Sequence, residues 1–382
     1  MNFDLSEEQT QVRDAVRELC MSEFAPHTAK WERDDAIPPT AIQKLAEMGL
    51  LGMSIPEAWG GLGYDARTVF VVIEEIARVS AALAIMVAVH NSVGAYPIYR
   101  YGSEEQRKKY LPKLTTTHVG AFSLSEANSG SDASALRTTA RRDGDHYVLT
   151  GEKTWVTNGK HTWTFLVFAR TGAPGPKGIS AFIVEKDQPG LTIGKSEDKI
   201  GLRGSDTVTL SFDGARVPAA QRLGGEGEGF KIALSMLDSG RIGVAAQALG
   251  VMTAAYFEAV KYAQQREAWG GPIAKLQAVQ FKLAEMERRV QASRLLIQKA
   301  AWLKDTGQDF IRAASMAKLY ATEAATWVTH QAIQVHGGFG LVKEYAVERY
   351  YRDVRVMEIY EGTSEIQRLV IARSLLKDGV KA

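Results

Sequence analysis

The segment 358–367 (EIYEGTSEIQ) places a carboxylate on a glycine-flanked loop just before an expected helix. Ser364 and Gln367 have the spacing of a capping box, which predicts that a helix begins near Glu365. Glu361 then lies outside that N-terminus, where a carboxylate can act as a general base and the helix end can hold an anion. Taken alone, the motif is more typical of an exposed loop glutamate.

Two further stretches place polar and aromatic side chains where strands are expected. Residues 121–132 (AFSLSEANSGSD) contain four serines, one glycine and two carboxylates, and hydroxyls and amides in a tight loop can hold a pyrophosphate or a heteroaromatic edge. Residues 155–159 (WVTNG) could stack on and hydrogen-bond a flat ligand. Local chemistry alone favours a polar turn for the first stretch and an Asn-Gly hairpin for the second.

A glycine cluster interrupts the helix-rich end of the chain at residues 334–340 (QVHGGFG). Three glycines in seven residues either end a helix or let the backbone come very close to a ligand. The local sequence does not decide between these interpretations.

Several common chemistries have no motif in the chain. No Gly-x-Gly-x-x-Gly follows an expected strand, and neither Gly-x-x-x-x-Gly-Lys-Ser/Thr nor Gly-x-Ser-x-Gly occurs. The seven histidines are scattered, without a His-Glu-x-x-His or Cys-x-x-Cys pair. These absences argue against nicotinamide-binding Rossmann domains, P-loop hydrolases and the common metal and serine-hydrolase sites.

Composition sets the class of protein and excludes some partners. The 382 residues are 45% hydrophobic and 24% charged, as in globular proteins with two or three domains. The 46 Lys and Arg nearly balance the 44 Asp and Glu, which argues against nucleic-acid binding. Cys20 is the single cysteine, which fits a reducing compartment. The longest apolar run, 81–89, is shorter than the roughly 18 residues of a membrane helix, and no secretory signal is visible, so we expect no membrane insertion.

The elements that must position these stretches fall into three blocks. No proline follows Pro272, and 17 of the 35 glycines lie between Gly120 and Gly229. A proline-free tail predicts long helices, and a glycine-rich middle predicts turns between strands. The expected order is therefore helical (1–118), β (119–228) and helical (229–382).

Local patterns place individual elements within these blocks. Capping boxes at 6–9 and 103–106 predict helix starts, and 68–89 predicts one or two buried helices. Short strands without intervening helical patterns predict an antiparallel β domain. Apolar residues between 276 and 300 step by threes and fours, as in a bundle helix. The expected strands are 146–150, 165–169, 180–184 and 208–212.

Together and in this order, the motifs resemble the acyl-CoA dehydrogenase family over the whole chain. The most specific pieces are LSE…GSD at 124–132 and IYEGTSEIQ at 359–367. The stretches 198–205 (DKIGLRGS) and 237–243 (LDSGRIG) are similar to the short-chain, butyryl-CoA branch. Some family members carry the catalytic base at the position matching Gly240, where glycine cannot serve, so the resemblance assigns the base to Glu361.

The resemblance implies a fold, a cofactor and an assembly. The fold is an N-terminal helical domain (1–118), a middle antiparallel β-barrel (119–228) and a C-terminal four-helix bundle (229–382). FAD lies between the β domain and the bundle of a homotetramer built as a dimer of dimers, and Arg266 and Gln277 reach it from a neighbouring subunit. The implied FAD-binding residues are Phe122, Leu124, Ser125, Ser131, Trp155, Val156, Thr157, Arg266, Gln277, Gln334, Val335, His336, Gly337, Gly338, Thr363 and Glu365. The implied acyl-CoA contacts are Ser131, Asp238, Arg241 and Gly362.

The implied reaction converts a short-chain acyl-CoA to the trans-2-enoyl-CoA, as in fatty-acid β-oxidation. Glu361 removes the α-proton while flavin N5 accepts the β-hydride, and electrons pass on to electron-transfer flavoprotein. An apolar pocket raises the pKa of a carboxylate and makes it the stronger base. Two kinds of alternative function stay open. One is the same chemistry on a branched substrate (isobutyryl- or 2-methylbutyryl-CoA, from branched-chain amino acid degradation) or on a medium-chain acyl-CoA. The more remote one is a flavin-free interaction scaffold. The expected location is the bacterial cytoplasm, or the mitochondrial matrix for a processed eukaryotic chain.

Overall fold

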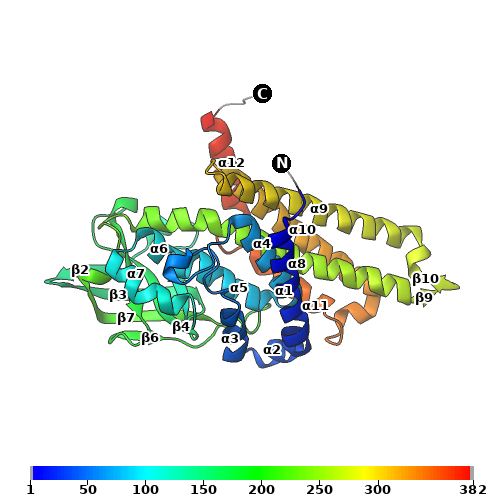
Figure 1. Cartoon of the computed structure of the whole chain (residues 1–382), viewed down its shortest axis with the longest axis horizontal. Coiled ribbons are helices and arrows are strands. Elements are labelled where there is room, and N and C mark those ends of the chain that lie inside the picture. Colours follow the sequence, from blue (N-terminus) through cyan, green and yellow to red (C-terminus); the bar gives the residue numbers. More distant parts are fainter. Residues whose placement is uncertain (1–2, 379–382) are drawn as a thin grey trace.

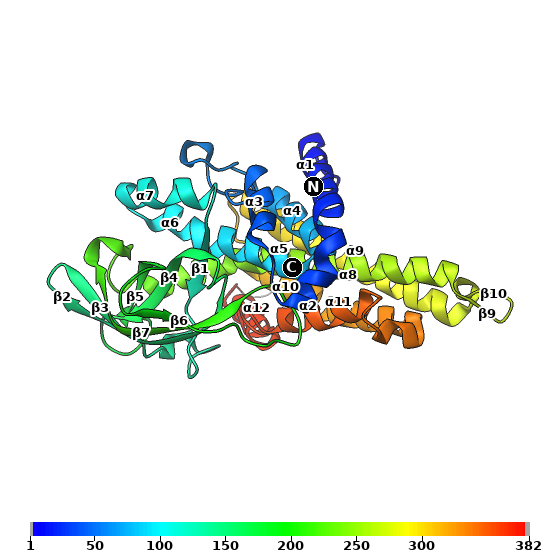
Figure 2. The same ribbon diagram turned by 90° about the horizontal axis from the view of Figure 1, so that it is seen from below.

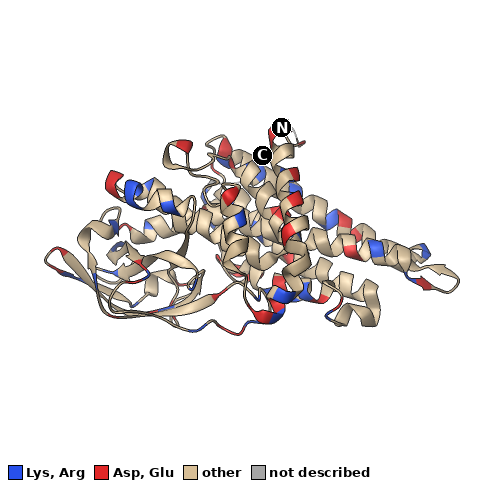
Figure 3. Cartoon of the chain, turned by 60° about the horizontal axis from the view of Figure 1, so that its bottom comes forward, with Lys and Arg blue, Asp and Glu red and all other residues tan. Residues whose placement is uncertain are grey.

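Helix-rich, strand-rich and again helix-rich regions follow one another along the chain, as the glycine and proline distribution predicts. The structure is a computed structural model, and it describes residues 3–378. Figures 1 and 2 show the strands β2–β7 gathered at one end and the long helices α8–α10 running to the opposite end. Lys and Arg are interspersed with Asp and Glu over both halves (Figure 3).

The N-terminal region is helical, and its expected start signals are confirmed. Ser6 and Gln9 form a capping box at the start of the first helix, and Ser103 and Gln106 form another. The segment 68–89 divides at Ser80, whose side chain accepts a hydrogen bond from Leu83 N and caps the second helix. The helices are α1 (Glu7–Leu19), α2 (Thr28–Asp34), α3 (Pro39–Glu47), α4 (Ala66–Val79), α5 (Ala81–Val89), α6 (Tyr96–Tyr101) and α7 (Glu104–Leu114).

Two helical stretches are long and apolar enough to cross a membrane by length and composition alone. They are Ala81–Tyr101, where a π-helical turn extends α5 into α6, and Gly229–Gln265. The most apolar windows of the two stretches are 89% and 72% buried inside the protein. Such burial is also found in core helices of soluble proteins, so these stretches are weak evidence for membrane insertion.

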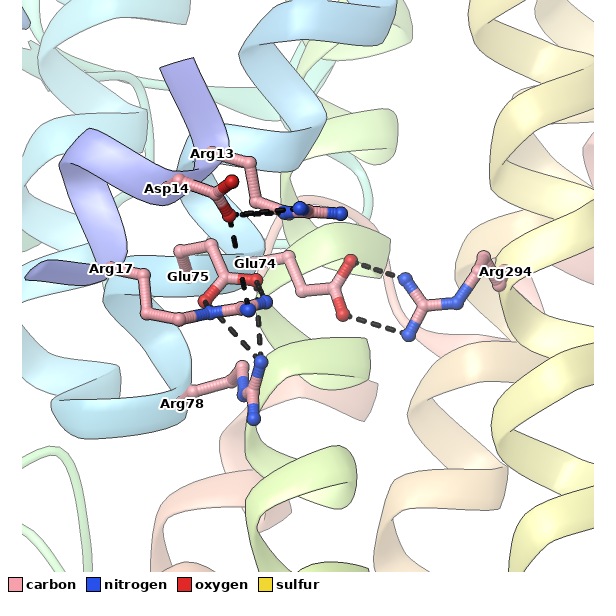
Figure 4. A network of polar contacts seen from close by, with 7 residues as sticks. All are labelled: Arg13, Asp14, Arg17, Glu74, Glu75, Arg78 and Arg294. Carbon is pink, nitrogen blue, oxygen red and sulfur yellow. Dashed lines mark hydrogen bonds and ion pairs between the residues drawn. The ribbon is translucent and has the colours of Figure 1, made fainter. Parts of the chain in front are cut away.

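A network of arginines and glutamates joins the N-terminal helices to the C-terminal region (Figure 4). Glu74 of α4 accepts two hydrogen bonds from Arg294, at 2.6 and 2.8 Å. The neighbouring Glu75 accepts two from Arg17 of α1, at 2.9 and 2.7 Å. Both glutamate side chains are only 5% exposed. Because paired, charge-assisted bonds of this kind are strong, the network fixes α1 and α4 against the helix that carries Arg294.

The middle region is a mixed sheet. It therefore differs in two respects from the expected antiparallel β-barrel: it is not closed within the described residues 3–378, and some of its strands pair in parallel. The strand order is β6-β7-β3-β2-β4-β5-β8, and pairing among the described residues does not close it into a barrel. Most pairs are antiparallel, but β1 and β2 both pair with β4 in parallel. The strands are β1 (Val119–Ser123), β2 (Thr139–Asp143), β3 (His146–Thr157), β4 (Thr162–Arg170), β5 (Ile179–Glu185), β6 (Leu191–Ile193), β7 (Thr207–Pro218) and β8 (Arg222–Leu223).

The Asn-Gly turn after β3 does not make a hairpin, contrary to its local sequence. β3 pairs with β2 and β7, whereas β4 pairs with β5, β1 and one residue of β2. Asn158 is fully buried, and its Nδ2 donates to the carbonyls of Met86 and Gly120 at 3.0 and 3.3 Å. These tertiary bonds hold the turn against α5 and β1, and the strand that follows pairs with β1 and β5 instead of β3.

The C-terminal region is helical, as expected. α8, α9 and α10 pack on one another, and α4 packs on α8 and α9. α12 packs mainly on α10 and stands apart from the other long helices (Figure 1). The elements are α8 (Gly229–Gln265), β9 (Glu267–Ala268), β10 (Gly271–Pro272), α9 (Gln277–Asp305), α10 (Ile311–His336), α11 (Val347–Val354) and α12 (Ser364–Asp378).

Candidate active site

Glu361 lies on the loop before α12 in a strained backbone conformation. Its φ is +49°, in the left-handed region that side chains other than glycine, asparagine and aspartate seldom adopt. Its Oε2 atom is buried without a hydrogen-bond partner. A Cβ atom added to Gly240 of α8 would lie 2.2 Å from that Oε2. The glycine therefore leaves the space that the carboxylate occupies.

Two buried cations from different helices lie beside this carboxylate. Lys318 of α10 is 1% exposed and Arg241 of α8 is 5% exposed. Burial raises the pKa of Glu361 to about 7, and the charges of Lys318 and Arg241 hold it below what burial alone would give. The loop glutamate is thus a carboxyl group that titrates near neutral pH.

Hydrogen bonds connect the loop to α5, α8 and α10. Lys318 Nζ donates to the carbonyls of Tyr360, at 2.8 Å, and Gly362. The Tyr360 hydroxyl donates to Gln247 Oε1, and Gln247 Nε2 donates to Ala81 O at 2.8 Å. The loop is therefore fixed on both sides of Glu361.

The helix after the loop begins one residue earlier than expected. Thr363, not Ser364, caps it: Ile366 N donates to Thr363 Oγ1 at 3.4 Å, and Ser364 belongs to α12 with its hydroxyl buried and unpartnered. Gln367 does not complete a capping box and instead donates from Nε2 to Gly362 O at 2.9 Å. The exposed Glu365 stands in the first turn of the helix.

Arg241 and Asp238 form an ion pair on α8 at 2.8 Å, one turn apart. Arg241 NH1 also donates to Ser315 Oγ at 3.1 Å, while its Nε is buried without a partner. Burial raises the pKa of Asp238, and the neighbouring Arg241 charge lowers it. The pair presents a partly unsatisfied cation next to the base.

In the β domain, the serine-rich stretch and the tryptophan stretch lie side by side. Thr154 N donates to Ser125 O at 2.9 Å. Glu126 holds the serine loop in place, because it accepts from Arg137 N at 2.6 Å and from Lys153 Nζ at 2.7 Å. Lys153 is fully buried. The two predicted flavin segments are thus brought together by backbone contacts.

Three observations fit a flat heteroaromatic cofactor at this edge of the sheet. Trp155 is 64% exposed, unusual for so large an apolar side chain, and its φ is +61° within a bulge of β3. Ser123 Oγ and Thr154 Oγ1 are buried without hydrogen-bond partners. An exposed ring and orphaned hydroxyls supply the stacking surface and polar contacts that FAD would use.

The remaining predicted FAD-binding residues of the β domain differ in exposure. Leu124 and Val156 are buried, Phe122, Ser125 and Thr157 are half-buried, and Ser131 is exposed. The Phe122 ring packs on Phe168 with centroids 4.9 Å apart. On the α12 side, Gly362 and Thr363 are half-buried.

The other predicted cofactor residues lie at the opposite end of the molecule. Arg266 follows the end of α8, and its guanidinium lies 5.8 Å from the Phe339 ring centre. The glycine cluster ends α10 at Gly337, whose φ is +59°. Arg241 and Arg266 are 25 residues apart along a continuous helix, which is about 37 Å. One chain therefore does not bring these residues to Glu361.

The residues of that second set also differ in exposure. Val335 and His336 are buried, whereas Gln334, Gly337, Gly338, Arg266 and Gln277 are exposed. His336 stacks on Tyr262 with ring centroids 4.2 Å apart.

Sequence reasoning missed three residues that build the site: Lys318, Gln247 and Lys153. Lys318 carries a recognisable signal, because it interrupts a buried stripe of small residues, including Ala314, Ala317 and Ala321, on α10. A lysine in such a stripe needs a buried partner. Neither Gln247 nor Lys153 stands out locally.

Comparison with known proteins places this geometry in a family. Profiles of the acyl-CoA dehydrogenase N-terminal, middle and C-terminal domains match residues 6–118, 121–215 and 227–376. The mitochondrial short-chain specific acyl-CoA dehydrogenase of Bos taurus is 47% identical over 378 residues, covering 98% of this chain and 92% of that protein.

Solved structures agree with this placement. Butyryl-CoA dehydrogenase from Megasphaera elsdenii is 40% identical with a TM-score of 0.97, over 98% of this chain and 100% of that one. A chain in a structure described as the electron transferring flavoprotein of Acidaminococcus fermentans is 44% identical with a TM-score of 0.97, over 99% and 100%. The chain belongs to the acyl-CoA dehydrogenase family, FAD-dependent flavoproteins and oxidoreductases that act on CH–CH bonds.

Proposed function

We propose that the chain oxidises a short-chain acyl-CoA to the trans-2-enoyl-CoA, with Glu361 as the base that takes the α-proton. The observation that carries the proposal is the Glu361 carboxylate, whose Oε2 is buried and unpartnered beside two buried cations. A carboxylate without water or hydrogen-bond donors is a stronger base than one in solution. With a pKa of about 7, a large fraction of the group is ionised at neutral pH.

The α-proton of a thioester is weakly acidic, so the developing enolate also needs stabilisation. Donors aimed at the thioester carbonyl provide it, and removal of one such donor typically costs ~10²–10³ in rate. We assign one donor to the backbone N–H of Glu361, following the family resemblance. Base and donor then belong to the same residue, which keeps the proton and the carbonyl in one fixed geometry.

FAD would bind between the β domain and the start of α12. Ser125, Trp155 and Thr157 would hold it from the sheet, with Phe122, Leu124, Ser131 and Val156, and Thr363 and Glu365 from the helix. Bound FAD supplies the acceptor for the hydride that leaves the β-carbon. The chain's own residues orient the substrate, exclude water and hold the α-proton on Glu361.

Acyl-CoA would contact Ser131, Asp238, Arg241 and Gly362. Charges of both signs are interspersed over the molecule (Figure 3), so local groups must meet the anionic CoA, and the unpartnered Arg241 Nε is one candidate. The short-chain preference is supported by the bovine short-chain relative and by the butyryl-CoA dehydrogenase structure. Gln247 is fully buried and occupies the space between α5, α8 and the loop that carries Glu361.

The opposite end of the chain would complete the FAD site of a second subunit. Arg266 lies about 37 Å from Arg241 along α8, and it contacts Phe339 beside the 334–338 segment. This separation fits the proposed homotetramer. Large apolar side chains are also exposed, with Trp269 at 87% and Leu376 at 83%. We propose electron-transfer flavoprotein as the acceptor, supported by the relative in the Acidaminococcus structure.

The test is an anaerobic titration of the FAD-loaded protein with butyryl-, isobutyryl-, octanoyl- and isovaleryl-CoA. We expect butyryl-CoA to bleach the flavin most effectively. Glu361→Gln should retain FAD but lose bleaching, while the exposed Glu344→Gln should behave as wild type. Bleaching by Glu361→Gln at the wild-type rate would refute the base, and a maximum with isobutyryl- or octanoyl-CoA would replace the short-chain preference.

A further inference from the structure

Lys318 is a fully buried lysine whose role the reaction above leaves open. Its side chain extends from α10 to the loop that carries Glu361, and the residue is 1% exposed. Among the ion pairs of the described residues, none joins Lys318 to a carboxylate. Its ammonium instead donates to the carbonyls of Tyr360 and Gly362. Burial of a charge is costly unless the charge is paired and hydrogen-bonded, so these two bonds offset part of the cost of burying Lys318.

The two carbonyls belong to the residues on either side of Glu361. In a planar trans peptide the C=O and the following N–H point in opposite directions. The bond from Lys318 to Tyr360 O therefore sets the direction of the Glu361 N–H, and the bond to Gly362 O fixes the chain just after the base. Donation to the carbonyl also polarises that peptide and strengthens its N–H as a donor.

The charged groups around the loop come from three elements. Lys318 and Arg241 act on Glu361 from α10 and α8, and Glu358 acts on Lys318 from the turn before the loop. Asp238 offsets part of the Arg241 charge. Burial lowers the pKa of Lys318 to about 8, and the charges of Glu361 and Glu358 oppose that fall. The lysine is thus cationic over the range in which Glu361 loses its proton.

We infer that Lys318 is a positioning residue for the dehydrogenation: it holds Glu361 in its left-handed conformation, aims the Glu361 N–H and keeps the carboxylate ionised at neutral pH. The inference rests on the proposed function, because it assigns a role only if Glu361 is the base. Lys318 itself touches neither substrate nor FAD in this scheme.

Three variants separate the charge of Lys318 from its hydrogen bonds. Lys318→Arg retains both, Lys318→Gln retains a donor without charge, and Lys318→Met retains neither. The measurement is the rate of flavin reduction by butyryl-CoA in the FAD-loaded protein, by anaerobic rapid mixing from pH 5.5 to 9. Lys304→Met is the control. Burial also lowers the pKa of Lys304, but this lysine acts on Asp305. The Asp305 carboxylate accepts a hydrogen bond from Ala66 N at the start of α4.

We expect the acidic limb of the pH profile to move up by about one pH unit in Lys318→Met and Lys318→Gln, because the Lys318 charge lowers the pKa of Glu361 and a nearby opposite charge typically lowers a carboxyl pKa by about 1–3 units. The high-pH plateau should fall at least about tenfold in Lys318→Met, because the amide donor is no longer aimed, and less in Lys318→Gln. Lys318→Arg and Lys304→Met should keep the wild-type limb.

An unchanged limb in Lys318→Met would overturn the inference, even with a lower melting temperature, because a purely structural lysine affects all pH values alike. If Lys318→Met does not retain FAD, the Lys318→Gln profile decides by the same criterion. Glu361→Gln in the same assay distinguishes the two claims. If it reduces flavin normally, the proposed base is wrong; if it is inactive while Lys318→Met titrates as wild type, only the role of Lys318 is wrong.

Discussion

Replacement of Gly240 by alanine tests where the Glu361 carboxylate lies. The added Cβ would stand 2.2 Å from Glu361 Oε2, whereas ordinary van der Waals contact begins at 3.4 Å. The carboxylate must therefore retreat by about 1 Å, and a misplacement of that size can cost ~100-fold in rate. We expect flavin reduction by butyryl-CoA to slow by about that factor in Gly240→Ala.

The same substitution should hardly change stability. Alanine in a helix interior is better than glycine by about 1 kcal/mol. A displaced side chain forced off its preferred rotamer costs ~0.5–1.5 kcal/mol, so the two effects nearly cancel. Because the clashing atoms are the far end of a side chain and not backbone, the fold can accommodate the methyl group. The expected result is a slow enzyme with a near wild-type melting temperature.

Gly243 provides a matched control on the same helix. A Cβ there would meet only Ala88 Cβ, at 3.9 Å. Gly243→Ala should therefore keep full activity and gain the helix-propensity stabilisation of about 1 kcal/mol. Rapid-mixing flavin reduction and thermal unfolding of the FAD-loaded proteins measure both effects. Wild-type reduction rates in Gly240→Ala would refute the placement of the carboxylate against α8, and with it the explanation for a glycine at this position.

Three further predictions test the electrostatics and the assembly. Glu74→Gln breaks the paired bonds to Arg294 (Figure 4) and should lower the free energy of unfolding by about 2 kcal/mol in thermal denaturation. This is less than the penalty for breaking a fully buried ion pair, because Arg294 is partly exposed. Burial raises the pKa of Asp353 to about 6. The folded state therefore has its full stability below the unfolded pKa near 4 and loses it as pH rises through 6. At pH 8, Asp353→Asn should raise the free energy of unfolding by up to about 3 kcal/mol and unfold at a higher temperature than wild type, with no such gain at pH 4. Co-expressed Arg266→Ala and Glu361→Gln chains should recover activity that neither has alone, because one site in a mixed dimer pairs an intact base with an intact partner arginine; no recovery would argue against a shared site.

The helices and the four expected strands, which lie within β3, β4, β5 and β7, could be predicted largely from local sequence, whereas the pairing of the strands could not. Ser6 and Ser103 cap their helices as the motifs indicate, because a capping box is satisfied within four residues. The hairpin prediction at Asn158 is wrong because its amide binds Met86 O and Gly120 O, partners 72 and 38 residues away in the chain. The parallel pairing of β1 with β4 has no local signal either. Local rules hold where both partners are near in sequence.

The same division explains what could be foreseen of the site. Glu361 stood out because glycine and a helix start surround it, and the tryptophan stretch stood out by its residue types. The space for the carboxylate, the two cations and the bonds of Gln247 come from helices far away in sequence. A strained φ at Glu361 and at Trp155 is likewise visible only in the structure. Unpartnered polar atoms lie at or beside both positions, Oε2 of Glu361 itself and Oγ1 of Thr154 next to Trp155, and functional sites are where local rules are expected to break.

A loop base whose reacting oxygen is buried faces two opposing demands, and the surrounding residues set the balance. Burial makes the carboxylate a stronger base but also favours its protonated, inactive form. Without nearby charge, a fully buried carboxyl group can reach a pKa of ~8–9, so few molecules would be active at neutral pH. Hydrogen bonds to the carboxylate would also correct this, but they would occupy the oxygen that must take the proton. Lys318 and Arg241 lower the pKa to about 7 through space, without occupying the oxygen that must take the proton.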